Sequence, residues 1–119
     1  MNTILLKEMS PERKAQKLDR LFRTCQEAFG QSLRALESGH AKTALGTLER
    51  LVSIQEDISI LMLEKERSLS VQGKIENKLA ELKKYTEGFR VAVEINSIIE
   101  ARNFSRWGVE LISELAELD

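Results

Sequence analysis

Residues 33–51, LRALESGHAKTALGTLERL, hold the signal that decides the fold of this chain. Apolar residues recur at steps of three and four up to Leu36, and the same spacing resumes at Ala44, which is typical of two amphipathic helices. Between them, Ser38-Gly39-His40 predicts a tight turn, because glycine adopts the left-handed conformation that ends many helices. Two helices joined by so short a turn run back along each other, so this stretch predicts an antiparallel helical hairpin.

The first helix of this hairpin begins far upstream, at Ser10-Pro11-Glu12. Serine caps helix N-termini, proline is tolerated at the first helical position, and glutamate suits the positive end of the helix dipole. We therefore predict a helix over residues 11–38. Its apolar side chains form one stripe, made of Ala15, Leu18, Leu21, Phe22, Cys25, Ala28, Phe29, Leu33 and Leu36.

Downstream of the hairpin turn, the apolar spacing predicts helices over residues 41–70 and 74–102. Residues 70–73 are either a turn or a bend in one long helix, because the apolar phase continues through them. Two capping residues, Asn103 and Ser105, mark the start of a shorter amphipathic helix over residues 104–119. No segment alternates as a strand does. The sequence therefore predicts an all-α fold, an elongated antiparallel bundle of three long helices plus a shorter C-terminal helix.

Length and charge set the class of protein. The chain has 119 residues with a formal net charge of -1, which predicts a single helical-bundle domain over residues 1–119, with a flexible N-terminus over residues 1–10. So balanced a charge argues against binding to nucleic acid or acidic lipid. The apolar residues 4–6 are too few for a signal-peptide core, and no uncharged run reaches the roughly 20 residues of a membrane span. We expect a cytoplasmic protein without membrane insertion.

Groups that carry catalysis or hold metals are scarce. Cys25 and His40 are the single cysteine and histidine, which is too few for a disulfide or for a structural zinc site. Glu37 and His40 have the spacing of one half of a di-iron motif, whose other half would need a second histidine. We therefore expect no enzyme, no metal and no cofactor. Histidine phosphotransfer through His40 is a third interpretation, although Lys42 and Gly46 do not match the spacing of that pattern.

Polar and small residues interrupt the apolar pattern in two ways. A buried polar group without a partner costs about 1–3 kcal/mol, so the polar members of the inward stripe either fix the register of the helices or mark a face left for another chain. These members are Ser32, Gln55, Thr86 and Asn96. Gly30 and Gly46 lie at similar heights on either side of the turn, which favours close packing of the first two helices over local flexibility.

The C-terminal segment contains the candidate partner-binding residues. Two of the chain's six aromatic residues lie there in an amphipathic run, and such a helix covers either its own bundle or a groove on a partner. The candidate contacts are Phe104, Trp107, Leu111, Ile112 and Leu115. If they bind a partner, removal of residues 104–119 abolishes that binding and leaves the first three helices folded. The alternative is a fourth helix packed in the bundle.

The hairpin also resembles a known family. The apolar helix ending at Ser38-Gly39 and the Leu- and Glu-rich helix that follows it are similar to the first helical hairpin of flagellar and type III secretion export chaperones. The resemblance covers residues 18–69, and it implies binding of a helix-forming export substrate or a component of the secretion apparatus, with the C-terminal helix taking part. We therefore expect a non-enzymatic cytoplasmic export chaperone or adaptor. The alternative is a homodimeric structural subunit of a larger assembly.

Overall fold

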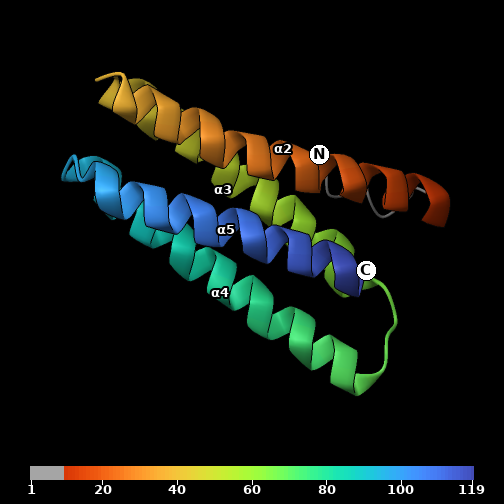
Figure 1. Ribbon diagram of the computed structural model, residues 1–119. Coiled ribbons are helices and arrows are strands. Elements are labelled where there is room, and N and C mark those ends of the chain that lie inside the picture. The colour runs from red at the N-terminus through yellow and green to blue at the C-terminus, as the bar shows by residue number, and fades with distance from the viewer. Residues whose placement is uncertain (1–9) are drawn as a thin grey trace.

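The computed structural model describes residues 10–119, and this part of the chain is helical throughout, with short connections and no strand. The helices are α2 (Pro11–Glu37), α3 (Ala41–Glu64), α4 (Leu69–Glu94) and α5 (Ile98–Leu118). Figure 1 shows that consecutive helices run in opposite directions. The predicted all-α helical bundle is confirmed. The expected flexible N-terminus lies outside the described residues, except for Ser10.

The start of α2 is where the sequence predicts it. The Ser10 side chain accepts a hydrogen bond from the backbone N–H of Arg13 at 3.3 Å, and Pro11 is the first helical residue. The serine thereby satisfies one of the free N–H groups of the first turn, and the proline, which has no N–H, adds no unsatisfied donor.

The turns after α2 and α4 use the same backbone motif. After α2, Gly39 has a φ of 82° and the N–H of His40 donates to the carbonyl of Ala35 at 2.8 Å. After α4, Asn96 takes the place of the glycine with a φ of 58°, and the next N–H donates to the carbonyl of Ala92 at 2.8 Å. Both are Schellman-type helix ends, in which a left-handed residue lets the last carbonyls find donors. The predicted turn after α2 is confirmed.

The boundary between the last two helices differs from the prediction. The third helix ends at Glu94, and the last begins at Ile98 rather than at 104. The reason is the turn at Asn96, followed by Ser97, whose side chain caps α5, whereas residues 103–105 lie inside that helix. The helices have 27, 24, 26 and 21 residues, so the C-terminal helix is the shortest of the four, although it is longer than the predicted residues 104–119.

The break between α3 and α4 lies at residues 65–68, just before the predicted position. Ser68 accepts a hydrogen bond from the N–H of Val71 at 3.3 Å and so begins α4. Residues 70–73 are helical, and a Cβ added at Gly73 would meet open space. Gly73 therefore neither turns the chain nor allows another helix to approach closely. Both alternatives for residues 70–73, a turn or a bend in one long helix, are wrong, because the break between the helices lies at residues 65–68 instead.

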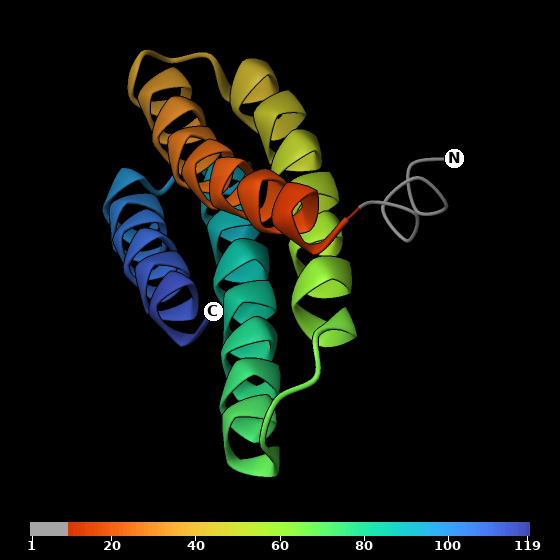
Figure 2. The same ribbon diagram turned by 90° about the vertical axis from the view of Figure 1, so that its right-hand side faces the viewer.

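The four helices form a ring in chain order, with α5 beside α2 (Figure 2). The pairs α2–α3 and α4–α5 make the most extensive contacts, and α3–α4 is the loosest neighbouring pair. The Cα positions extend over 42 × 30 × 17 Å. Apolar side chains of all four helices fill the core, where the rings of Phe29 and Phe89 lie 5.7 Å apart. The loose α3–α4 pair is where the bundle is least closed.

Two glycines allow close packing of helices, but they are not the two predicted ones. A Cβ at Gly88 would lie 2.5 Å from the ring of Phe104, and one at Gly108 would lie 2.5 Å from the ring of Phe29. By contrast, a Cβ at Gly46 would meet nothing within 4 Å, and one at Gly30 would meet only the side chain of Arg34. The prediction of close packing at Gly30 and Gly46 is therefore wrong.

Candidate partner-binding groove

The predicted contacts on α5 are divided between the surface and the core. Trp107 is partly exposed, with its ring against Tyr85 of α4 at 5.9 Å and edge-on to the half-buried ring of Phe104 at 5.4 Å. Leu111, Ile112 and Leu115 are all buried in the core between the helices. Because the last three side chains serve the bundle itself, the five residues do not form one accessible surface.

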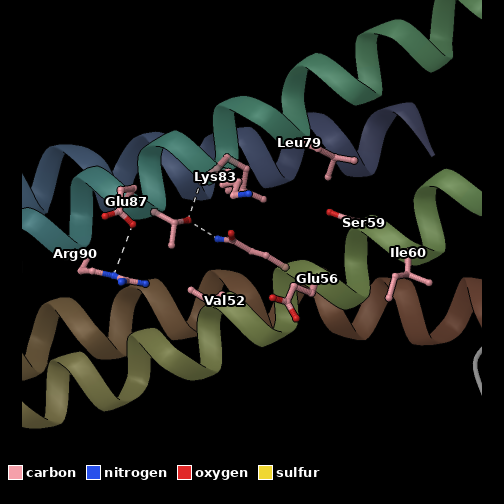
Figure 3. Close-up of a pocket in the computed structure, with 11 residues that line it drawn as sticks. Val52, Glu56, Ser59, Ile60, Leu79, Lys83, Glu87 and Arg90 are labelled. Atoms are coloured by element: carbon pink, nitrogen blue, oxygen red, sulfur yellow. Dashed lines mark hydrogen bonds and ion pairs between the residues drawn. The ribbon is translucent and has the colours of Figure 1, made fainter. Parts of the chain in front are cut away.

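A groove lies between α3 and α4, where the neighbouring helices are least tightly packed. It has a volume of about 490 Å³, and Figure 3 shows the side chains that line it from both helices. The lining from α3 comprises Val52, Gln55, Glu56, Ser59 and Ile60. The lining from α4 comprises Leu79, Leu82, Lys83, Thr86, Glu87 and Arg90.

The floor of the groove contains two of the polar residues that interrupt the apolar stripes. The Gln55 amide donates a hydrogen bond to the Thr86 hydroxyl, which in turn donates to the carbonyl of Leu82 at 2.8 Å. This bond is the buried polar link between α3 and α4, and it holds the two helices in register while both side chains keep their partners. This hydrogen bond fits the first of the two explanations drawn from the sequence, that polar residues in the inward stripe fix the register of the helices.

The other two polar interruptions lie elsewhere. The Ser32 hydroxyl donates to the carbonyl of Ala44 at 2.8 Å and so links α2 to α3. Asn96 is exposed at the turn before α5, so its assignment to the inward stripe is wrong. Its left-handed backbone explains the residue type, because asparagine tolerates that conformation better than other non-glycine residues.

Charged side chains stand at the rim of the groove. Glu56 of α3 and Lys83 and Arg90 of α4 lie on its opposite sides (Figure 3). Arg90 pairs with Glu87 of its own helix at 3.7 Å. Neither Glu56 nor Lys83 forms an ion pair within residues 10–119. The rim therefore offers one unpaired negative and one unpaired positive charge above a largely apolar floor.

Cys25 of α2 lies in the core, where it contacts the side chain of Gln55. Burial raises the pKa of its thiol from 9.0 to about 12, and a hydrogen bond from the Gln55 side chain offsets part of that rise. The thiol is fully buried and stays protonated at neutral pH. Since the thiolate is the reactive form, Cys25 is an inert packing residue.

We expect the Cys25 proton to make folding sensitive to alkaline pH. Above pH 9 the unfolded chain loses this proton while the folded chain keeps it up to about 12, so the free energy of unfolding falls as the pH rises through this window. The loss between pH 8 and pH 10 should be about 1 kcal/mol. Urea denaturation of the wild type and of Cys25→Ala measures it, and the variant should lack this part of the decrease. Equal decreases in both proteins would contradict the assignment.

The other features considered in the sequence are His40, a metal site and a membrane span. His40 is exposed at the start of α3, and its side chain forms no cap hydrogen bond. Among residues 10–119, no three His, Cys, Asp or Glu side chains gather in a way that could hold a metal ion. None of the helices α2 to α5 has an apolar stretch long enough to cross a membrane.

The sequence pattern indicated Gln55 and Thr86 as unusual residues, but it did not indicate the groove. The polar interruptions were the available signal, whereas the presence of Val52, Ile60 and Leu79 in one groove depends on how α3 and α4 are spaced. Comparisons with protein-family models, with curated proteins and with solved structures give no match to this chain.

Proposed function

We propose that this chain is a non-enzymatic binding protein, a chaperone or adaptor that holds an amphipathic helix of a client protein in the α3–α4 groove. The observation that carries this proposal is the groove itself, which has apolar side chains at its floor and charges at its rim. An amphipathic helix laid in such a groove buries its apolar face and leaves its polar face in water.

The dimensions of the groove suit a short helical segment. Its lining on α4 runs from Leu79 to Arg90, which corresponds to about 16 Å along the helix axis. About three turns of a client helix match this length, with apolar side chains at positions i, i+3, i+4 and i+7. The loose α3–α4 contact also favours this site, because moving apart two helices with few contacts costs the bundle less than opening a tightly packed pair.

The rim charges specify the flanks of the client helix. A basic side chain next to Glu56 and an acidic one next to Lys83 would each find a partner that has no ion pair among residues 10–119. A client helix with one basic flank and one acidic flank therefore fits better than a helix whose flanks carry the same charge. The resemblance of the α2–α3 hairpin to export chaperones favours an export substrate, bound in the cytoplasm, as the client.

We expect a substitution inside the groove to weaken helix binding, and the same substitution outside it to have no effect. Ser59 lines the groove, whereas Ser53 is exposed on the same helix and does not line it. Ser59→Arg should place a long charged side chain in the groove and weaken binding by about tenfold or more, while Ser53→Arg should leave it unchanged. The measurement is fluorescence anisotropy of labelled, designed amphipathic peptides of about 18 residues.

The flanks of the designed peptides provide the second comparison. A peptide with one Lys flank and one Glu flank should bind more tightly than a peptide of the same apolar face with Lys on both flanks or Glu on both. Equal binding of all three peptides would contradict the role of Glu56 and Lys83. Equal binding by the Ser59→Arg and Ser53→Arg variants would show that the client site is not this groove.

A further inference from the structure

An exposed apolar surface runs across the outer side of α4 and α5, away from the groove lining. We call it the α5 ridge, and it consists of Val91, Ile95, Ile99 and Trp107, which are 46%, 61%, 73% and 38% exposed. Val91 and Trp107 border one shallow hollow of about 450 Å³, together with Gly88, Glu100, Asn103 and Phe104. Isolated exposed apolar residues are ordinary, but these three aliphatic side chains and Trp107, with the half-buried ring of Phe104 beside it, form a patch that indicates an interaction surface.

The outward face of α5 has an internal symmetry about Asn103. Ile99 and Trp107 lie four residues on either side of it, and Glu100 and Arg106 lie three residues on either side. Residues three and four apart share a helix face, so these positions look outward together. When such a helix meets a copy of itself running in the opposite direction, each residue lies level with its counterpart across the centre.

We propose that the α5 ridge binds a second copy of this chain, with the two α5 helices antiparallel about a two-fold axis at Asn103. The axis places each Trp107 level with Ile99 of the second copy, so each of the two large aromatic rings in the dimer covers one strongly exposed isoleucine. Val91 of α4 and Ile95, the residue that follows this helix, add apolar surface alongside this contact.

Charge complementarity favours a second copy over an unrelated partner. The same axis brings each Arg106 level with Glu100 of the second copy, which gives two opposite-charge pairs from one sequence. Within residues 10–119 neither side chain forms an ion pair, and Arg106 makes only a long hydrogen bond of 3.4 Å to Asn103.

The residue at the axis also suits a self-contact. An asparagine amide both donates and accepts hydrogen bonds, so Asn103 can pair with its own copy. A single polar residue at the centre of an apolar helix interface fixes the register, as it does in coiled coils.

The test is a charge exchange in the full chain. The wild type should form a dimer in sedimentation equilibrium over about 1 to 500 µM, and the emission of Trp107, the only tryptophan, should shift to the blue as the dimer forms. Arg106→Glu and Glu100→Arg should each weaken the dimer by about tenfold, because each places like charges together at two sites. The double variant Glu100→Arg with Arg106→Glu restores opposite charges and should restore the dimer.

Controls separate this surface from folding and from the groove. Both charged side chains are exposed, so all variants should keep the helix content of the wild type and a cooperative thermal transition in circular dichroism. Leu69→Ser changes an exposed leucine outside the ridge and should dimerise as the wild type does. A chain that stays monomeric over the whole concentration range overturns the proposal. So does a dimer that Arg106→Glu does not weaken, or two single variants whose loss the double variant does not restore.

Discussion

Removal of residues 104–119 is expected to abolish cooperative folding of the whole bundle. This deletion takes away Leu111, Ile112 and Leu115, which are buried in the core, and it exposes the faces of α2 and α4 that pack against α5. Loss of one such buried side chain typically costs about 2–5 kcal/mol, and a domain of this size has a total stability of about 5–15 kcal/mol. The free energy of unfolding should therefore fall to zero or below.

Thermal and urea denaturation followed by circular dichroism measure this effect. The truncated chain should show reduced helix content and no sharp transition, while the full chain with Trp107→Ala, a change at the exposed edge of α5, should keep its transition. A sharp transition in the truncated chain would contradict the prediction and would restore the sequence-based expectation that α5 is separable. If it unfolds as expected, deletion cannot be used to map partner binding, and point substitutions such as Ser59→Arg and Arg106→Glu are needed.

The parts of the fold that were predicted correctly depend on local chemistry. Ser10 and Pro11 begin α2, and Gly39 forms the turn after it. Capping and the left-handed backbone conformation depend on only a few neighbouring residues. The all-α class followed from the period of the apolar residues. These signals do not depend on where the other helices lie.

The end of α4, which the sequence did not predict, has the same backbone geometry as the turn after α2, which it did predict. Asn96 ends α4 with the backbone that Gly39 uses after α2, but asparagine is less characteristic of a helix end than glycine. Gly73 gave the opposite error, because a glycine inside a helix resembles a break although it only lowers the helix propensity. In both places the residue type alone does not specify the backbone conformation.

The candidate sites needed information that no single helix contains. The polar interruptions at Gln55 and Thr86 indicated an unusual position on each helix, but their hydrogen bond across the floor of a groove depends on the pairing of α3 with α4. For α5, the amphipathic pattern identified the helix, but it could not show that Trp107 lies at the exposed edge of the helix while Ile112 lies in the core. Such a division requires the positions of both neighbours of α5, which are α4 and α2.

Gly108→Ala is expected to destabilise the bundle, although alanine is the better helix former. The added Cβ would lie 2.5 Å from the ring of Phe29, which is fully buried and packs against the ring of Phe89 at 5.7 Å. Since that ring has no free space to move into, α5 and α2 must separate. Overpacking of this kind costs about 1–3 kcal/mol, which exceeds the gain of at most about 1 kcal/mol in helix propensity.

A matched pair of controls distinguishes crowding from helix propensity. Gly46→Ala makes the same substitution where the new Cβ meets open space, so the free energy of unfolding should rise by up to about 1 kcal/mol. The free energy of unfolding of Gly88→Ala should lie between those of Gly46→Ala and Gly108→Ala. The new Cβ at residue 88 meets the ring of Phe104, which is only half-buried and has room to turn. Urea denaturation of the three variants should therefore rank them as Gly46→Ala, Gly88→Ala, Gly108→Ala in decreasing stability. A stabilised Gly108→Ala variant would mean that α5 does not approach α2 as closely as the ring contact at Phe29 requires, and the burial of Ile112 and Leu115 would then have to be reconsidered with it.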